Sequence, residues 1–237
     1  LEQLSRILEP QYILTSDSDK SPYLTDWRKR FTGRALAVLL PSNTEEVAKI
    51  VRLCSDHQVS VVPQGGHTGF CGGATPDESG NQIVLNLKRM NQVRELDIDN
   101  QTITLEAGCI LQSIQETAAK EGFLFPLSLG AEGSCMIGGN LATNAGGTNV
   151  LRYGNARDLC LGLEVVTAKG EVWYGLKGLR KDNTGYDLRD LFIGSEGTLG
   201  IITAAVMKLY PLPISQWTTL VATDSIQSAI TLLGLFQ

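Results

Sequence analysis

Histidine is scarce in this sequence, and several features that mark particular protein classes are missing. Only His57 and His67 occur among the 237 residues, which leaves too few imidazoles for a transition-metal site built within the chain. The five cysteines are odd in number and form no Cys-x-x-Cys pair. This pattern argues against a disulfide framework and favours reduced thiols, so we expect a cytoplasmic protein.

Long apolar runs and a strong charge of either sign are also missing. No apolar stretch approaches the roughly 20 residues that a membrane span needs, and residues 1–10 predict a short amphipathic helix rather than a signal peptide. The net charge of −5 gives no electrostatic reason to expect nucleic acid as a partner. There is no initiator methionine, so we expect the numbering to begin inside a longer protein.

The distribution of apolar residues predicts an α+β protein with two units. The first unit has the order β-α-β-β, and its helix begins at a capping box of Ser42 and Glu45. Its strands are expected at 35–40, 59–62 and 83–87. The second unit begins with a hairpin of strands at 93–98 and 102–107, followed by a helix whose apolar positions lie at 111–118 and whose C-terminal cap is Gly122. A second hairpin at 163–168 and 171–174, a helical turn at 187–192 and a strand at 199–209 come later in the chain.

Pro211 and Pro213 mark a natural boundary near the end of the long strand. We predict an N-terminal arm at 1–34, which includes Trp27 and Arg28, and a main domain at 35–212 with subdomains at about 35–90 and 91–212. A strand at 217–222 and a helix at 225–236 indicate that 213–237 begins a second, truncated domain. A tail docked on the main domain is the alternative.

Glycine is the one residue in excess, with 25 copies, and eleven of them fall in two short stretches. The first stretch follows a predicted strand and contains no lysine or arginine, so an anion there would be held by backbone amide dipoles. Its spacing fits neither a P-loop nor the Gly-x-Gly-x-x-Gly of nicotinamide enzymes. A tight structural turn stays open as the other interpretation.

The second stretch, residues 130–147, interleaves glycine with amide and hydroxyl side chains such as Ser134, Asn140 and Thr143. These side chains hydrogen-bond sugar-like hydroxyls and heteroaromatic edges. Two loops of this kind on different units predict a long, dinucleotide-like ligand between the units.

Three motifs then carry a resemblance to a known family. They are Pro-Gln-Gly-Gly-His-Thr-Gly at 63–69, Ile-Gly-Gly-Asn at 137–140 with Asn-Ala-Gly-Gly at 144–147, and Gly-Ser-Glu-Gly-Thr-Leu-Gly-Ile-Ile-Thr at 194–203. Together they resemble the vanillyl-alcohol-oxidase-type FAD-binding domain, also called p-cresol-methylhydroxylase-type or PCMH-type, over about residues 34–213. The segment at 179–187 is most similar to the D-2-hydroxyglutarate dehydrogenase branch, near D-lactate dehydrogenases and glycolate oxidase subunits.

The resemblance implies two α+β subdomains with FAD between them, and it assigns cofactor contacts residue by residue. Around the pyrophosphate it places Pro63, Gln64, Gly65, Gly66, His67, Thr68 and Gly69. On the flavin and ribityl side it places Ser134, Gly138, Gly139, Asn140, Asn144, Ala145, Gly146 and Gly147. It also includes Gly72, Leu129, Gly130 and Ile137 among the cofactor-binding residues. Towards the other end of FAD it places Glu196, Gly200 and Ile201.

The resemblance also implies a reaction. A D-2-hydroxy acid similar to 2-hydroxyglutarate or lactate is oxidised by hydride transfer to flavin N5, and an external acceptor (an electron-transfer flavoprotein, quinone or cytochrome) takes the electrons. In this branch the catalytic base, the substrate-carboxylate binders and a divalent metal belong to a later domain. We therefore assign no catalytic or metal-binding residue before 237 and expect this segment alone to be inactive.

Several alternatives stay open at this stage. His67 either forms a covalent 8α-histidyl link to FAD or is a neutral histidine hydrogen-bonded within its loop, with FAD held non-covalently. Cys71 and Cys135 are interpreted as small buried apolar side chains, and Lys181, Asp182 and Asp187 as a surface charge cluster. Two other functions share the fold: a non-catalytic FAD-domain subunit of a multi-subunit oxidase, and a flavin reductase of the UDP-N-acetylenolpyruvoylglucosamine reductase type.

Overall fold

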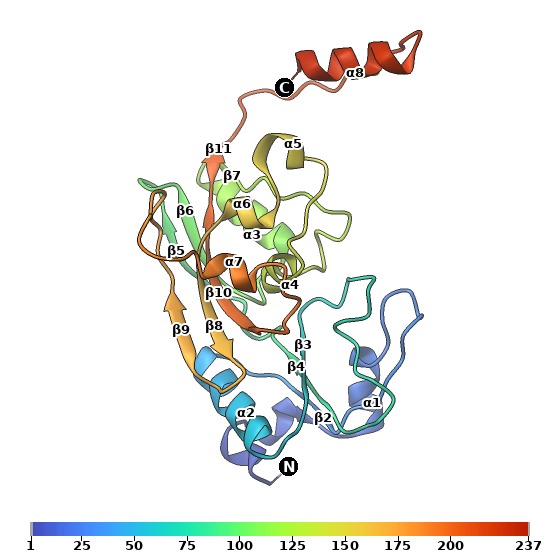
Figure 1. Ribbon diagram of the computed structural model, residues 1–237, viewed down its shortest axis with the longest axis vertical. Coiled ribbons are helices and arrows are strands. Elements are labelled where there is room, and N and C mark those ends of the chain that lie inside the picture. Colours follow the sequence, from blue (N-terminus) through green and yellow to red (C-terminus); the bar gives the residue numbers. More distant parts are fainter. Residues whose placement is uncertain (1, 237) are drawn as a thin grey trace.

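A four-stranded sheet forms the centre of the first subdomain in the computed structural model, which describes residues 2–236 (Figure 1). Its strand order is β1-β2-β4-β3. β2 (Ala37–Leu39), β4 (Ile83–Asn86) and β3 (Val61–Gln64) run parallel, and β1 (Ile13–Leu14) joins antiparallel to β2. Every residue of β2 and β4 is buried, which is why both strands are almost entirely apolar.

The crossover helix α2 (Thr44–Asp56) confirms the predicted β-α-β-β order, but its N-cap is Asn43, one residue later than the predicted Ser42. The Asn43 side chain accepts from the Glu46 backbone N–H at 2.9 Å, and the Glu46 carboxylate accepts from the Ser42 N–H at 2.7 Å. The shift makes Thr44 the first helical residue. Its hydroxyl then donates to Glu164 Oε1 at 2.5 Å in the other subdomain, so tertiary packing selects the cap.

The second subdomain contains an antiparallel five-stranded sheet of order β5-β6-β10-β8-β9. Its strands are β5 (Val93–Asp97), β6 (Thr102–Glu106), β8 (Cys160–Thr167), β9 (Val172–Gly175) and β10 (Gly200–Lys208). One face packs on α3 (Leu111–Lys120) and α4 (Ile137–Ala142) around a buried apolar core. Both predicted hairpins are confirmed, as is the end of α3 before Gly122, whose φ of +78° suits glycine.

The two subdomains share buried contacts. Val166 and Ile201 of the five-stranded sheet lie in the same apolar core as α2. Thr44 Oγ1 of α2 donates across the junction to Glu164 Oε1 at 2.5 Å, and within the second subdomain Arg94 at 3.3 Å and Thr203 Oγ1 at 2.9 Å bind the same buried carboxylate. These contacts fix the orientation of the first glycine loop relative to the second.

The remaining elements are short. They are α1 (Asp17–Lys20), α5 (Val150–Tyr153), α6 (Ala156–Leu159), α7 (Arg189–Phe192), β7 (Phe123–Leu124), β11 (Tyr210–Pro211) and three 3-10 turns at Leu4–Arg6, Pro10–Tyr12 and Ser21–Tyr23. The mixture of a mostly parallel and an antiparallel sheet with helices confirms the α+β class. Among the described residues, no helix combines the length and apolarity that crossing a membrane requires.

Two expectations near the chain ends are wrong. Residues 2–10 form 3-10 turns around buried Leu4 and Leu8 rather than an amphipathic α-helix, since so short a helix is marginal and Pro10 interrupts it. Residues 217–222 form no strand, because no neighbouring strand pairs with them. The predicted helix is present as α8 (Ile226–Leu235) and extends away from the body (Figure 1). Leu1 and Gln237, the outer limits of the predicted arm and final segment, lie outside the described residues.

Candidate functional site

A cavity of about 310 Å³ lies where the two subdomains meet, and both glycine-rich stretches contribute to it. Its walls come from the end of β3 and the following loop, from the start of α4, and from the turn that leads into β10. Of the predicted cofactor residues, the cavity is lined by Pro63, Gln64, Gly65, Gly66, His67, Thr68, Gly69, Gly72, Gly138, Gly139, Asn140, Glu196, Gly200 and Ile201. Three motifs far apart in the sequence therefore meet in one hollow.

Gln64 anchors the first glycine loop. Its side chain is buried, and its amide Nε2 donates to the carbonyls of Tyr23 and Ala74 at 2.9 and 2.8 Å. Asn86 Nδ2 donates to Gln64 Oε1 at 3.0 Å and to the Gly65 carbonyl at 2.9 Å. The Gln64 amide is thus committed to holding the loop in shape. Asn86 was not predicted from the sequence, although a polar residue at the end of an apolar strand is a recognisable signal.

The glycines at this site are of two kinds. A Cβ at Gly69 or at Gly139 would meet no protein atom within 4 Å. A Cβ at Gly66 would lie 2.0 Å from the Ser134 carbonyl oxygen, and one at Gly138 would lie 2.7 Å from Ala107 Cβ. Gly69 and Gly139 therefore leave open space that a ligand can fill, whereas Gly66 and Gly138 allow two segments of the protein to pack closely.

Asn140 presents a buried polar atom without a partner. The residue is 4% exposed, it lines the cavity, and its Oδ1 accepts no hydrogen bond within the described chain. A buried acceptor left unpaired costs free energy, of about 1–3 kcal/mol. A ligand that donates a hydrogen bond at this position removes that cost. The open glycine cradles and this acceptor together fit a ligand that combines anionic oxygens with N–H or O–H donors, as FAD does.

Three of the six non-glycine residues with positive φ in the described chain lie in these motifs. His67, Asn144 and Glu196 all adopt positive φ, at 55°, 47° and 52°. Such conformations cost free energy in residues other than glycine and persist where the surrounding structure imposes them. Their presence in all three motifs indicates that the loop shapes are constrained.

His67 lies in the cavity wall, hydrogen-bonded through Nε2 to Thr75 Oγ1 at 3.0 Å. Burial lowers the pKa of its imidazole, and the nearby Asp26 carboxylate opposes that shift. The pKa of Asp26 is itself held below its usual range by backbone N–H donors, foremost Phe31 at 2.6 Å, with Arg28 and Arg30. These shifts describe a neutral His67 beside an ionised Asp26 at neutral pH.

Eight predicted residues do not line this cavity. They are Leu129, Gly130, Ser134, Ile137, Asn144, Ala145, Gly146 and Gly147. Several of them have structural contacts instead: Ile137 is a fully buried core residue, and Asn144 Oδ1 accepts a hydrogen bond from the Arg157 backbone N–H at 3.0 Å. A Cβ at Gly147 would lie 1.7 Å from the Ser128 carbonyl oxygen. The cavity also gains lining residues that were not predicted, among them Asp26, Phe70, Thr75 and Met136.

The cysteines are all free, but they differ in environment. Cys135 is buried as predicted, whereas Cys71 is exposed in the cavity wall, which corrects its interpretation as a core residue. Burial raises the pKa of Cys160 to about 12 and those of Cys54 and Cys109 to about 11. Within residues 2–236 no group of three or more His, Cys, Asp or Glu side chains could hold a metal ion.

A second hollow, of about 590 Å³, lies beside α7 and shares no residue with the first. Asp182 and Asp187 line it, and each has a basic neighbour: Lys177 Nζ lies 3.7 Å from Asp182 Oδ2, and Arg189 pairs with Asp187. These pairs agree with the interpretation of this segment as a surface charge cluster.

Comparisons with known proteins point to one family. The chain matches the family described as FAD binding domain over residues 35–174. It is 47% identical over 213 residues to a D-2-hydroxyglutarate dehydrogenase from Bos taurus, a match that covers 90% of this chain and 39% of that enzyme. It is 40% identical to a D-2-hydroxyglutarate dehydrogenase from Xanthomonas citri pv. viticola, with coverage of 94% and 47%. The chain thus spans less than half the length of these curated relatives.

A solved structure of alkyldihydroxyacetonephosphate synthase has the same fold. It superposes with a TM-score of 0.81 at 24% sequence identity, over 90% of this chain and 40% of that one. At this identity the likeness concerns the fold alone.

The relatives also correct one expectation: the enzymes from Bos taurus, Arabidopsis thaliana and Danio rerio are named mitochondrial, which contradicts the cytoplasmic location inferred from the cysteines. Free thiols indicate a reducing environment without identifying the compartment.

Proposed function

This chain belongs to the FAD-binding domain family, and we propose that it is the cofactor-binding part of a flavoprotein dehydrogenase that oxidises a D-2-hydroxy acid. The observation that carries the proposal is the meeting of both glycine stretches in one cavity with an unpartnered Asn140 Oδ1. Such an arrangement suits an elongated ligand with anionic oxygens and hydrogen-bond donors. The identity to D-2-hydroxyglutarate dehydrogenases supports 2-hydroxyglutarate as the substrate class.

In this proposal the backbone of residues 65–69 holds the pyrophosphate. The loop contains no lysine or arginine, so its N–H groups carry the interaction. The space beside Gly69 allows the phosphate oxygens to approach the backbone, and the hydrogen bond between Asn86 and Gln64 holds the loop in its conformation. Gly139 and Asn140 on α4 face the ribityl and flavin portion, where Asn140 Oδ1 accepts a hydrogen bond. Glu196, Gly200 and Ile201 close the other end.

FAD, when bound, supplies the hydride acceptor for oxidation of the hydroxy acid at C2. The role of this chain is to place the cofactor, to exclude water through the apolar walls of Ile201 and Met136, and to keep the nearby His67 neutral. The catalytic base, the substrate-carboxylate ligands and any divalent metal are assigned to the remainder of the full-length protein. The acceptor class is an electron-transfer flavoprotein, quinone or cytochrome.

We infer that FAD is held non-covalently. His67 Nε2 already hydrogen-bonds Thr75 Oγ1 at 3.0 Å within the loop, as the non-covalent alternative requires. Denaturation of the flavin-loaded chain should release all of the flavin, and intact mass should equal that of the polypeptide. Flavin retained on the denatured chain would instead establish the 8α-histidyl link.

Two measurements test the proposed function. The purified chain, mixed with FAD and desalted, should retain the visible absorbance bands of oxidised flavin. The full-length enzyme should then reduce a dye with D-2-hydroxyglutarate, while this chain alone should not. Absence of bound flavin would favour the non-catalytic subunit, and flavin-dependent NADPH oxidation without hydroxy-acid oxidation would favour the reductase.

A further inference from the structure

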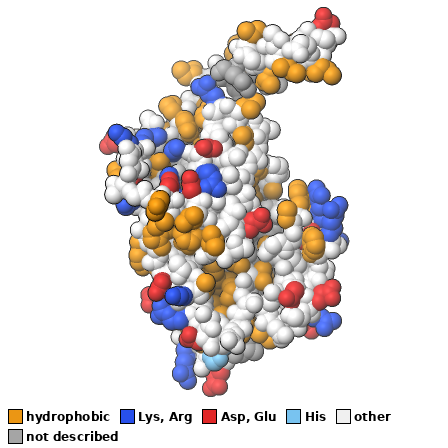
Figure 2. Space-filling model, in the orientation of Figure 1, with side chains coloured by type: hydrophobic (Ala, Val, Ile, Leu, Met, Phe, Trp, Pro, Cys, Tyr) orange, Lys and Arg blue, Asp and Glu red, His pale blue; other side chains and the backbone are white. Residues whose placement is uncertain are grey.

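An exposed cluster of aromatic and basic side chains lies at the edge of the glycine cavity. It consists of Trp27, Arg28, Lys29, Arg30 and Phe31 on the hairpin around Thr25 and Thr32, together with Phe70 on the first glycine loop. Trp27 is 68% exposed, Phe70 52% and Phe31 44%. In Figure 2 basic side chains gather beside apolar ones at the right edge of the molecule. We call these six residues the aromatic–basic patch.

The patch is continuous with the cavity wall. Phe70 belongs to both, and Asp26, which also lines the cavity, fixes the hairpin through the backbone N–H groups of Arg28, Arg30 and Phe31. A Cβ at Gly72 would lie 2.7 Å from the Phe31 ring, so the hairpin packs directly on the glycine loop. A partner seated on the patch therefore sits against the wall of the proposed flavin site.

The side chains of the patch contact one another. The Trp27 and Phe70 rings are 5.9 Å apart, and the Arg28 guanidinium lies 3.8 Å from the centre of the Phe70 ring. Prearranged aromatic and arginine side chains are typical of the energetic centre of protein interfaces, because little conformational entropy is lost when they bind. Isolated exposed hydrophobic side chains are common on protein surfaces and would not by themselves indicate an interface.

The charge of the patch is opposite to that of the whole chain. Within the described residues, no carboxylate lies within salt-bridge distance of Arg28, Lys29 or Arg30, whereas the net charge of the chain is −5. Such an unpaired local cation cluster attracts an acidic surface and orients it on approach.

We propose that the aromatic–basic patch is the docking surface for an acidic electron-transfer protein that reoxidises the flavin. This inference rests on the proposed function. Oxidation of the hydroxy acid to the 2-oxo acid yields two electrons and two protons. The electrons leave the reduced flavin for the oxidised redox group of the docked protein, and the protons leave to solvent. Docking at the cavity wall shortens the path that the electrons travel.

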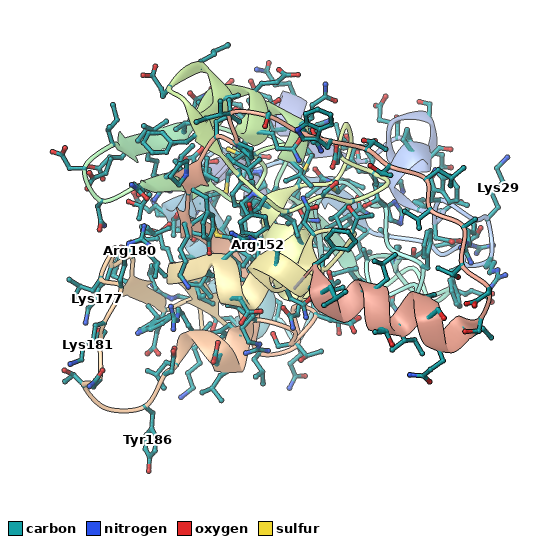
Figure 3. All side chains as sticks on the ribbon, turned by 90° about the horizontal axis from the view of Figure 1, so that it is seen from above. Lys29, Arg152, Lys177, Arg180, Lys181 and Tyr186 are labelled. Atoms are coloured by element: carbon teal, nitrogen blue, oxygen red, sulfur yellow. The ribbon has the colours of Figure 1, made fainter. Side chains whose placement is uncertain are left out.

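The test compares two charge-matched variants of the full-length enzyme. The patch variant carries Arg28→Gln, Lys29→Gln and Arg30→Gln, which keep the backbone N–H groups that Asp26 binds. The control variant carries Lys169→Gln, Lys177→Gln and Lys181→Gln on exposed positions elsewhere. Figure 3 places Lys29 on the opposite side of the molecule from Lys177 and Lys181.

With electron-transfer flavoprotein as the acceptor at low ionic strength, the patch variant should lose about ten- to a hundredfold in kcat/KM. The control variant should lose less than twofold, and high salt should remove the difference between them. Reduction of a small dye by D-2-hydroxyglutarate should be equal in all three proteins, and this readout tests the proposed function separately.

Three results would overturn the inference. One is an equal kcat/KM for electron-transfer flavoprotein in the patch and control variants. Another is the absence of any transfer from wild-type enzyme to that acceptor while the dye is still reduced. The third is binding of wild-type enzyme to vesicles of phosphatidylcholine and phosphatidylserine that the patch variant alone loses, which would make the patch a membrane contact.

Discussion

The first glycine loop and the second glycine stretch have similar compositions but use their glycines differently. Every residue from Pro63 to Gly73 lines the cavity, whereas the second stretch contributes seven of its eighteen residues, all between Cys135 and Thr143. Gly146 and Gly147 instead leave no room for a side chain: a Cβ would lie 2.4 Å from Asn155 Oδ1 at Gly146 and 1.7 Å from the Ser128 carbonyl oxygen at Gly147. Glycine clustering thus has two causes, close packing of the protein on itself and space for a ligand, and both clusters contain glycines of each kind.

The largest expected effect comes from a packed glycine in the first loop. Gly66→Ala places a Cβ 2.0 Å from the Ser134 carbonyl, and the backbone on both sides would have to move. We expect the free energy of unfolding of the chain without FAD to fall by about 3 kcal/mol, measured by urea denaturation. Gly69→Ala, which meets no atom within 4 Å, is the control and should change it by less than about 0.5 kcal/mol. Equal stability of the two variants would contradict the distinction between the two kinds of glycine.

Neighbouring glycines of α4 give the sharpest contrast. Gly138→Ala, whose Cβ would lie 2.7 Å from Ala107 Cβ, should lower stability by about 1–3 kcal/mol. Gly139→Ala should raise the stability of the FAD-free chain by about 0.5–1 kcal/mol, because alanine favours helix and nothing obstructs it. The same Gly139→Ala change should weaken FAD binding at least tenfold by fluorescence titration. Unchanged FAD affinity would remove Gly139 from the binding site.

Asn140 tests whether the second stretch contacts the ligand through a side chain. Asn140→Leu removes the unpartnered Oδ1, so the FAD-free chain should keep its stability, whereas FAD affinity should fall by about 1.5–3 kcal/mol. Thr143→Val is the matched control, because the Thr143 hydroxyl lines the same cavity but already donates to the Gly139 carbonyl at 2.8 Å. Isothermal titration of both variants measures the difference, and similar losses in the two would argue against a specific role for Asn140.

The smallest effect concerns pH. The pKa of His67 is lowered below 6.5 in the folded chain by burial. Between 6.5 and that lower value the unfolded chain binds a proton that the folded chain does not, so stability falls as pH decreases through this window. One proton contributes at most about 1.4 kcal/mol per pH unit. His67→Asn should make the unfolding free energy less dependent on pH between 7 and 5, and an unchanged slope would show that His67 does not titrate differently on folding.

Local pattern was sufficient for most of the regular structure. The hairpins, α2, α3 and the long β10 strand follow from alternation and helical spacing, and Gly122 marks the end of α3. The cap of α2 was misplaced by one residue, because the choice between Ser42 and Asn43 depends on Glu164, more than a hundred residues away. The strand expected at 217–222 failed for the same kind of reason, since a strand requires a partner that local sequence does not supply.

By itself, the sequence determined the fold class, because apolar periodicity is a local property, and it contains the three motifs whose resemblance to known proteins identified the FAD-binding family. Only the tertiary structure decided which glycines face the cavity, that Asn140 Oδ1 is left unpartnered, and that Trp27 and its basic neighbours lie against the first glycine loop. The physical reason is that burial, close approach and an unpaired hydrogen bond are properties of pairs of segments. Neither segment contains that information alone.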